Sequence, residues 1–128
     1  MKLTVPIYYK QEFKTKPAKT ILVGLNFYRN AHYMLLNKIK HFYHNIVKEQ
    51  LWTSEKKLDS YQVEYRIYLK NTLSDWPNVR SVIEKFVLDW LVEHWHLKDD
   101  SVKNLIWDNS IYLIDKENPR AEIIIHQL

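Results

Sequence analysis

Six polar residues between positions 75 and 100 have side chains suited to holding a divalent cation and neutralising an anion. They are Asp75, Asn78, Lys85, Asp89, Asp99 and Asp100. Aspartate carboxylates are oxygen ligands of the kind that Mg²⁺ takes in proteins, and a lysine ammonium offsets negative charge beside it. If the fold brings these side chains together, they form a site for metal-assisted chemistry.

Each of these residues also has an ordinary structural explanation. Asp75 is suited to cap a helix that follows it. Lys85 and Asp89 have the i,i+4 spacing of a surface ion pair, which contributes only a few tenths of a kcal/mol. Asp99 and Asp100 fall between two elements, where aspartates are common in turns. For each residue taken alone, the structural explanation is favoured. The hypothesis of a functional site therefore depends on the presence of all six residues together.

A predicted helix positions most of the six residues. Its start signals are an Asp or Ser cap and a proline within residues 74–77, and its pattern runs to about residue 95. Asn78, Lys85 and Asp89 form a narrow polar stripe beside its apolar arc, and residues 96–100 form the loop that follows. The arc comprises Val79, Val82, Ile83, Phe86, Val87, Trp90 and Leu91.

A second long helix is predicted over residues 26–50. Its core arc holds Tyr28, Ala31, Leu35, Ile39, Phe42 and Ile46. The opposite side carries a basic stripe with one aromatic residue, a candidate track for phosphates and about equally well an ordinary solvated helix face. The stripe comprises Arg29, Tyr33, Asn37, Lys40 and His44.

The remaining elements are predicted strands. Residues 61–70 alternate most clearly, with the odd-numbered side chains pointing one way. Strand patterns also cover residues 2–9, 20–25, 102–107, 110–114 and 120–126, with a basic loop at 10–19, a polar linker at 52–60 and a turn at 115–119. The order β-β-α-β-α-β-β predicts one α+β domain over residues 1–128, a mixed β-sheet with two long helices.

Composition excludes several classes of protein. The chain has no cysteine, which excludes disulfide scaffolds, thiolate zinc sites and a cysteine nucleophile. It has one glycine, Gly24, so a Gly-rich phosphate loop cannot be built and no nucleotide cofactor is expected. Nineteen Lys and Arg against fifteen Asp and Glu give a net charge of +4, which suits a polyanionic partner. No apolar stretch has the length of a membrane span and the N-terminus lacks a signal-peptide pattern, so a soluble cytoplasmic protein is expected.

The polar combination resembles the RusA-type Holliday junction resolvases, phage-type members in particular. The family has an Asp-x-Asp-Asn element, then a Lys, an Asp four residues on, and an Asp-Asp pair. The corresponding segments here are SDWPN, EKFVLDWL and HLKDDSV. LNFYRNAHY is similar to the family's early Asn-aromatic-Arg segment, and NPRAEIII to its closing strand. The resemblance covers most of the chain, through motifs that are each short.

The resemblance implies a fold, a cofactor and a site. It implies that Asp75 and Asp100 are Mg²⁺ ligands, with Asp89 or Asp99 completing the shell directly or through water, and Mn²⁺ able to substitute. Lys85 would stabilise phosphate charge or orient the water, and Asn78 would order the aspartates. Two features depart from the family: Pro77 replaces the second Asp, and the interval to Lys85 is about one helical turn longer. Glu84 is a poor substitute acid, because it lies on the other flank of the apolar arc.

Three functions follow as expectations. The first is a Mg²⁺-dependent endonuclease that resolves four-way DNA junctions, acts as a homodimer because the substrate is two-fold symmetric, and works in the cytoplasm (of the host, if phage-encoded). The second is a RusA-like protein that has lost catalysis and binds branched DNA or a replication partner, which Pro77 favours. The third is a basic adaptor without a nucleic-acid role.

Overall fold

The computed structural model describes residues 1–51, 58–71, 78–94, 97 and 105–128. It contains six strands and three helices in the described ranges. They are β1 (Lys2–Val5), β2 (Tyr8–Gln11), β3 (Lys19–Leu22), α1 (Leu25–Asn30), α2 (Tyr33–Gln50), β4 (Tyr61–Leu69), α3 (Val79–Glu93), β5 (Leu105–Ile114) and β6 (Arg120–Gln127).

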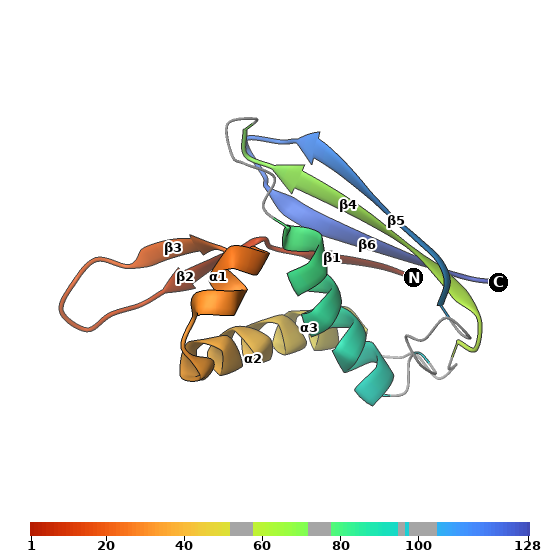
Figure 1. The fold of residues 1–128 in the computed structure, drawn as a ribbon, viewed down its shortest axis with the longest axis horizontal. Helices are drawn as coiled ribbons and strands as arrows, with labels where there is room; N and C mark the ends of the chain where they lie inside the picture. Colours follow the sequence, from red (N-terminus) through yellow and green to blue (C-terminus); the bar gives the residue numbers. More distant parts are fainter. Residues whose placement is uncertain (52–57, 72–77, 95–96, 98–104) are drawn as a thin grey trace.

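The strands form one mixed sheet and one separate hairpin. The four-stranded sheet has the order β1-β6-β4-β5, in which β4 and β5 are parallel and the other neighbours are antiparallel. Strands β2 and β3 pair with each other and project away from the rest of the molecule (Figure 1). The predicted α+β class with a mixed sheet is confirmed.

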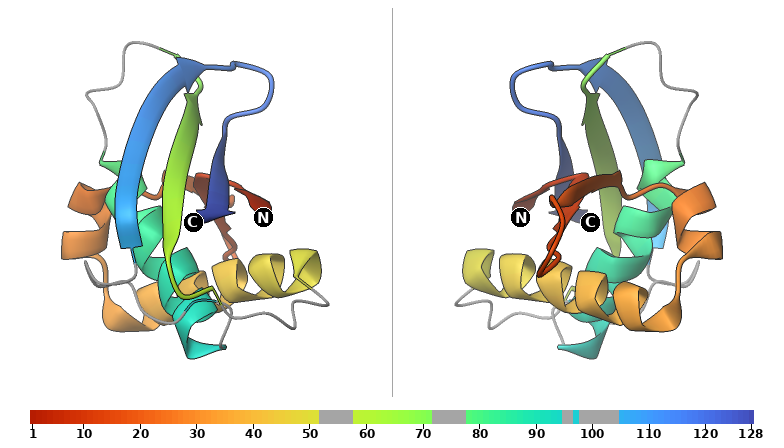
Figure 2. Two further views of the ribbon diagram at one scale, coloured as in Figure 1. Left: turned by 90° about the vertical axis from the view of Figure 1, so that its right-hand side faces the viewer. Right: turned by 90° about the vertical axis from the view of Figure 1, so that its left-hand side faces the viewer.

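The helices lie on one face of the four-stranded sheet (Figures 1 and 2). The alternation in β4 explains this arrangement, because Tyr61, Val63, Tyr65 and Ile67 are fully buried on that face while the residues between them are partly exposed. The predicted apolar arc of α3 is buried in full against the same core. Within the described ranges, none of the helices has the length and apolar character needed to cross a membrane.

The N-terminal strand is shorter than predicted. Residues 2–9 contribute to two strands: Lys2–Val5 form β1 of the four-stranded sheet, and β2 of the hairpin begins at Tyr8. The break between them includes Pro6. Proline has no amide hydrogen to donate to a ladder, so it interrupts a strand there. The strand predicted at 20–25 corresponds to β3, which covers Lys19–Leu22 and pairs across the hairpin, so it begins one residue earlier and ends three residues earlier than predicted. Its apolar run suits a buried strand, but Thr20 is exposed and Ile21 is buried.

The long N-terminal helix is divided in two, which corrects the prediction of one helix over 26–50. Ala31 is extended, and the His32 ring accepts a hydrogen bond from the amide of Met34 at 3.2 Å, capping α2. Because the two helices have separate axes, a single wheel misplaces the core face. The most buried residues of α2 are Ile39, Tyr43 and Val47, whereas Leu35, Phe42 and Ile46 are partly buried.

Two further boundaries differ from the prediction. Helix α3 begins at Val79, and its cap is Asn78 rather than the expected Ser or Asp further upstream. Residues 105–114 form one continuous strand, β5, where the sequence predicts two short strands at 102–107 and 110–114. Two strands, β5 and β6, therefore follow α3, which agrees with the two strands at the end of the predicted order. The predicted turn at 115–119 is confirmed: the Asp115 carboxylate accepts from the Asn118 amide at 3.1 Å and from the Arg120 guanidinium at 2.7 Å.

Candidate functional site

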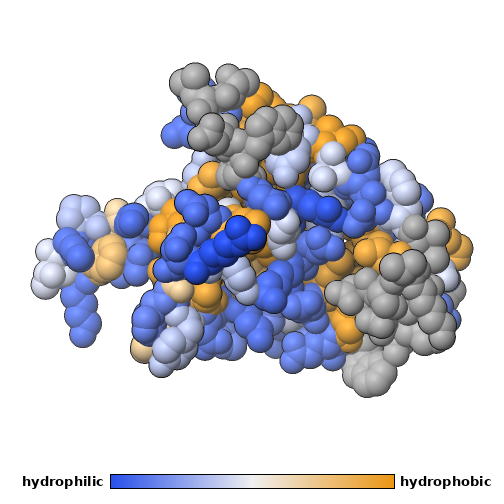
Figure 3. Space-filling view, in the orientation of Figure 1, coloured by the Kyte–Doolittle hydropathy of each residue, from blue (hydrophilic) through white to orange (hydrophobic). Residues whose placement is uncertain are grey.

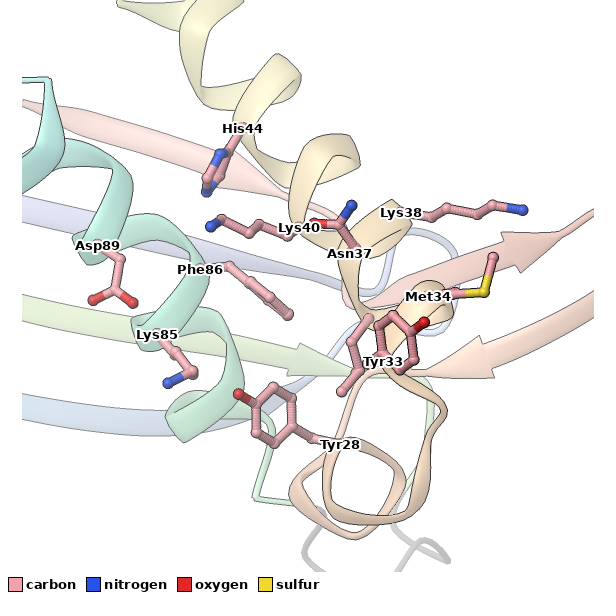
Figure 4. Close-up of a pocket in the computed structure, with 11 residues that line it drawn as sticks. Tyr28, Tyr33, Met34, Asn37, Lys38, Lys40, His44, Lys85, Phe86 and Asp89 are labelled. Atoms are coloured by element: carbon pink, nitrogen blue, oxygen red, sulfur yellow. The ribbon is translucent and has the colours of Figure 1, made fainter.

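A pocket of about 650 Å³ opens between α2 and α3 (Figure 4). Hydrophilic side chains predominate over these two helices on the surface shown in Figure 3. The pocket is lined by Tyr28, Tyr33, Met34, Leu36, Asn37, Lys38, Lys40, His44, Lys85, Phe86 and Asp89. Six of these are predicted site residues, so the pocket joins part of the α3 stripe to most of the stripe predicted on the first long helix.

One wall of the pocket is α3. Lys85 and Asp89 are exposed and lie one turn apart, and Phe86 between them is buried in the core. The Phe86 ring stacks on Tyr43 of α2, with centroids 5.5 Å apart and planes 11° apart. This stacked pair joins the two helices beneath the pocket, and it therefore fixes Lys85 and Asp89 relative to α2.

The opposite wall is α2. Tyr33, Asn37, Lys40 and His44 follow one another at intervals of three or four residues, so they share one face of the helix. In Figure 4, Lys40 and His44 extend from α2 toward α3, the side on which Asp89 stands. The spacing noted in the sequence is thus confirmed as one face, and that face forms a wall of the pocket.

Positive charge exceeds negative charge in the pocket. Among the described lining residues, Lys40 and Lys85 contribute two cationic groups and Asp89 is the one carboxylate, while the Lys38 side chain extends away from α3 in Figure 4. The Lys85 ammonium lies 5.8 Å from the centre of the Tyr28 ring. A cation at this distance from an aromatic face is attracted to it, which holds Lys85 at the rim of the pocket.

The pKa of His44, which lines the pocket, is shifted. Burial lowers its pKa below the usual value of 6.5, and the neighbouring Lys40 ammonium lowers it further. The ring nitrogen Nε2 is buried and makes no hydrogen bond to the described residues. A neutral imidazole with a buried nitrogen can accept or donate one hydrogen bond, so His44 is suited to a polar ligand that enters the pocket.

Two predicted site residues lie outside the pocket. Arg29 is exposed on α1 and is not among the lining residues. Asn78 caps α3, where its side-chain oxygen Oδ1 accepts from the Ser81 amide at 3.3 Å and from the Ser81 hydroxyl at 2.8 Å. Asp89 follows eleven residues later, about 16 Å along a helix axis. Asn78 and Asp89 therefore do not belong to one cluster.

Three of the expected metal ligands, Asp75, Asp99 and Asp100, lie outside the described residues, as does Pro77. Among the residues that the structure does describe, no group of three or more His, Asp or Glu side chains could hold a metal ion. Asp89 is thus the one expected ligand whose place is known, and it lies in the pocket with the cationic residues Lys40 and Lys85. The described pocket is suited to an anion.

Glu84 lies away from the pocket, as its place on the helical wheel predicts. Its carboxylate forms an ion pair with Arg80 one turn earlier, with Nε and Oε2 3.4 Å apart. Arg80 also pairs with Asp108 of β5 and lies over the Tyr65 ring at 4.9 Å. Glu84 is therefore part of an interaction between α3 and the sheet.

Several pocket residues are missing from the predicted site. The sequence pattern predicts Tyr28 and Phe86 as core residues only, because the apolar arc of a helix does not indicate a cavity at its border. Lys38 and Met34 carry no pattern that would have singled them out.

A search of protein-family models and a search of curated proteins both return no match to this chain.

Proposed function

We propose that the protein is a Mg²⁺-dependent endonuclease that cuts four-way DNA junctions, and that the pocket between α2 and α3 holds backbone phosphates. The observation that carries the proposal is the meeting of two separately predicted sets in one pocket. Lys85 and Asp89 come from the combination that resembles a junction resolvase, and Lys40, Asn37 and His44 come from the predicted phosphate track.

The charges of the pocket favour a phosphate ligand. Lysine contacts to phosphate supply most of the sequence-independent affinity of proteins for DNA. Lys40 and Lys85 approach the pocket from opposite helices, so a phosphate between them would be neutralised from two sides. Asn37 adds an amide donor, and the exposed ring of Tyr33 offers a surface for a sugar or a base.

Catalysis in this proposal divides between the pocket and the expected ligands. When bound, Mg²⁺ would supply positive charge to the phosphate and lower the pKa of a bound water. In this proposal, Asp89 would hold one ligand position directly or through water, and Lys85 would neutralise charge on the phosphate. The roles of Asp75, Asp99 and Asp100 rest on the sequence resemblance. The same resemblance gives Asn78, the N-cap of α3, the role of ordering the aspartates.

The second candidate function is binding without cleavage: the protein would be RusA-like and would bind branched DNA or a replication partner. Pro77 at the family's second Asp position favours it, since proline cannot ligate a metal. In both functions we expect a homodimer in the cytoplasm, where two pockets related by a two-fold axis would match a two-fold junction.

A nicking assay on a synthetic four-way junction, run with Mg²⁺ and with chelator, separates the two functions. The nuclease cuts only with Mg²⁺ or Mn²⁺, and Asp100→Asn stops cutting while binding persists or tightens. The tighter binding is expected because the substitution removes a charge that repels phosphate. Binding without any cutting under both conditions would establish the second function. A protein that neither binds nor cuts the junction would contradict the nuclease and the DNA-binding form of the second function.

A further inference from the structure

The outer edge of β5 differs from the opposite edge of the same sheet. At the β1 edge, the Gln50 side chain occupies the backbone groups of Thr4, accepting from its amide at 2.9 Å and donating to its carbonyl at 2.6 Å. Strand β1 is also short, begins with Lys2 and is followed by Pro6. Short length, lysine and proline are the usual protections of an edge strand, so β1 is closed to further pairing.

Strand β5 lacks these protections. It spans ten residues, contains neither lysine nor proline, and pairs only with β4 among the described residues. Its charged residue, Asp108, is paired with Arg80 of the same chain. A long edge strand with unpaired backbone groups is a template for another strand.

Exposed apolar side chains concentrate on β5. Of the eight large hydrophobic residues exposed in the described parts of the chain, four belong to this strand. They are Trp107, Ile111, Leu113 and Ile114. The register with β4 places the first three on the face that the helices do not cover, opposite Gln62, Arg66 and Tyr68.

Charged residues lie next to these apolar side chains on the open face. Arg66 pairs with Glu64 at 3.1 Å, and Arg120 pairs with Glu122 at 3.2 Å and lies over the Tyr68 ring at 3.8 Å. An interface that covered the whole face would have to desolvate these ion pairs. The apolar residues gather at the edge, so the partner is expected beside β5 in the plane of the sheet.

We propose that two copies of this chain pair through their β5 strands, antiparallel and two-fold symmetric, with Ser110 at the axis. Each four-stranded sheet then becomes half of an eight-stranded sheet. This inference deepens the dimer of the proposed function by naming its surface, although the surface itself is argued from β5 alone.

The side-chain pattern selects this register. Directly opposed residues of an antiparallel pair share a face, so the residue on the two-fold axis pairs with its own copy. With Ser110 on the axis, Trp107 faces Leu113 of the other copy and Asn109 faces Ile111. With Ile111 on the axis, Trp107 would face Asp115. An irregularity in the β4–β5 register falls between Tyr61 and Gln62, which ends the regular segment near Trp107 and disfavours a centre further toward the start of β5.

The absence of native cysteine makes a crosslinking test direct. In Ser110→Cys, the one possible disulfide joins position 110 of two copies, and opposed residues of an antiparallel pair lie within disulfide range. The matched control is Thr4→Cys, exposed on the protected β1 edge. Under mild oxidation without DNA or Mg²⁺, we expect Ser110→Cys to crosslink nearly completely and Thr4→Cys to remain mostly free.

Light scattering and sedimentation equilibrium supply the second readout. We expect the wild type to have twice the 15.7 kDa mass of one chain, and Ile111→Lys, which introduces a charge twice per dimer, to raise the dimer Kd at least about tenfold. Circular dichroism verifies that each variant is folded. A wild type that is monomeric at every concentration, a dimer unaffected by Ile111→Lys, or equal crosslinking of the two cysteine variants would overturn the interface. A monomer that still cuts junctions would overturn the interface alone, and a dimer that neither binds nor cuts DNA would overturn the proposed function alone.

Discussion

Lys85 of α3 holds its ammonium 5.8 Å from the centre of the Tyr28 ring of α1, and both residues line the pocket between α2 and α3. The Tyr28 ring also meets Phe86 edge to face, with centroids 6.0 Å apart. The short helix α1 therefore supports the same turn of α3 that carries the cationic side of the pocket. This relationship ties a core contact to the residue that we expect to neutralise phosphate.

Two buried tyrosines predict opposite responses to the loss of a hydroxyl group. Tyr43 donates a hydrogen bond to the carbonyl of Pro6 at 2.7 Å, whereas the Tyr65 hydroxyl is buried and has no hydrogen-bond partner among the residues that the structure describes. Tyr43→Phe leaves that carbonyl unsatisfied and should lower the free energy of unfolding by about 1–2 kcal/mol. Tyr65→Phe should leave it unchanged or raise it slightly, because the substitution removes an unpaired polar group.

Urea denaturation of both variants and the wild type measures this difference. The two variants serve as each other's control, since each deletes one oxygen from a fully buried ring. Equal destabilisation of the two would contradict the assignment of the hydrogen bond to Tyr43.

His44 predicts how the affinity for DNA changes with pH. Burial lowers its pKa below 6.5; Lys40, His41 and His94 lower it further, while Glu93 raises it. A phosphate bound beside the ring would raise the pKa again, so binding takes up a proton and affinity should increase as pH falls below neutrality. One group can contribute at most about one unit of log K per pH unit.

Fluorescence anisotropy with a labelled junction, at constant salt between neutral and mildly acidic pH, measures this slope. His44→Gln should reduce it by up to about one unit. His126→Gln, exposed at the end of β6, is the matched control and should keep the wild-type slope. Identical slopes for the wild type and His44→Gln would remove His44 from the binding surface.

Asp89→Asn separates binding from catalysis within the pocket. The substitution removes the one carboxylate among the described lining residues, so non-specific affinity for DNA should rise by a few-fold at low salt. If Asp89 holds a metal position, the same variant should cut junctions at least about a hundredfold more slowly at saturating protein.

Glu117→Gln makes the same change of charge in the turn between β5 and β6 and should alter neither quantity. Normal cutting by Asp89→Asn would exclude Asp89 from catalysis. Unchanged or weaker binding would show that the carboxylate does not face DNA.

The sequence predicted those parts of the fold in which one pattern continues without interruption. The alternation of Tyr61–Leu69 predicted the buried face of β4, and the apolar arc of α3 predicted its packing. The break at Ala31 and His32 could not be predicted, because a helical wheel assumes one helix axis. The residue that caps the start of α2 is also a histidine, which is not among the usual N-cap residues. Pro6 was visible, but its effect depends on which strands lie beside it.

The candidate site was predicted in part for the same reason. Six pocket residues were predicted from their spacing within a single helix each. Four of them lie on α2 and two on α3: Tyr33, Asn37, Lys40, His44, Lys85 and Asp89. No pattern within a helix states that two such stripes face each other across a pocket. Asn78 illustrates the limit: the wheel aligns it with Asp89, but the wheel omits the rise of about 16 Å between them.

The salt dependence of junction binding tests the central claim most directly, since that claim places DNA phosphates between Lys40 and Lys85. The measurement compares the wild type with the double variant Lys40→Ala/Lys85→Ala over a range of salt concentrations. A matched double variant, Lys48→Ala/Lys116→Ala, removes two exposed charges outside the pocket. If each pocket lysine contacts a phosphate, the slope of log K against log salt should shrink by about two units for the pocket variant and stay near the wild-type value for the matched one. A pocket variant with the affinity and slope of the wild type would contradict the account.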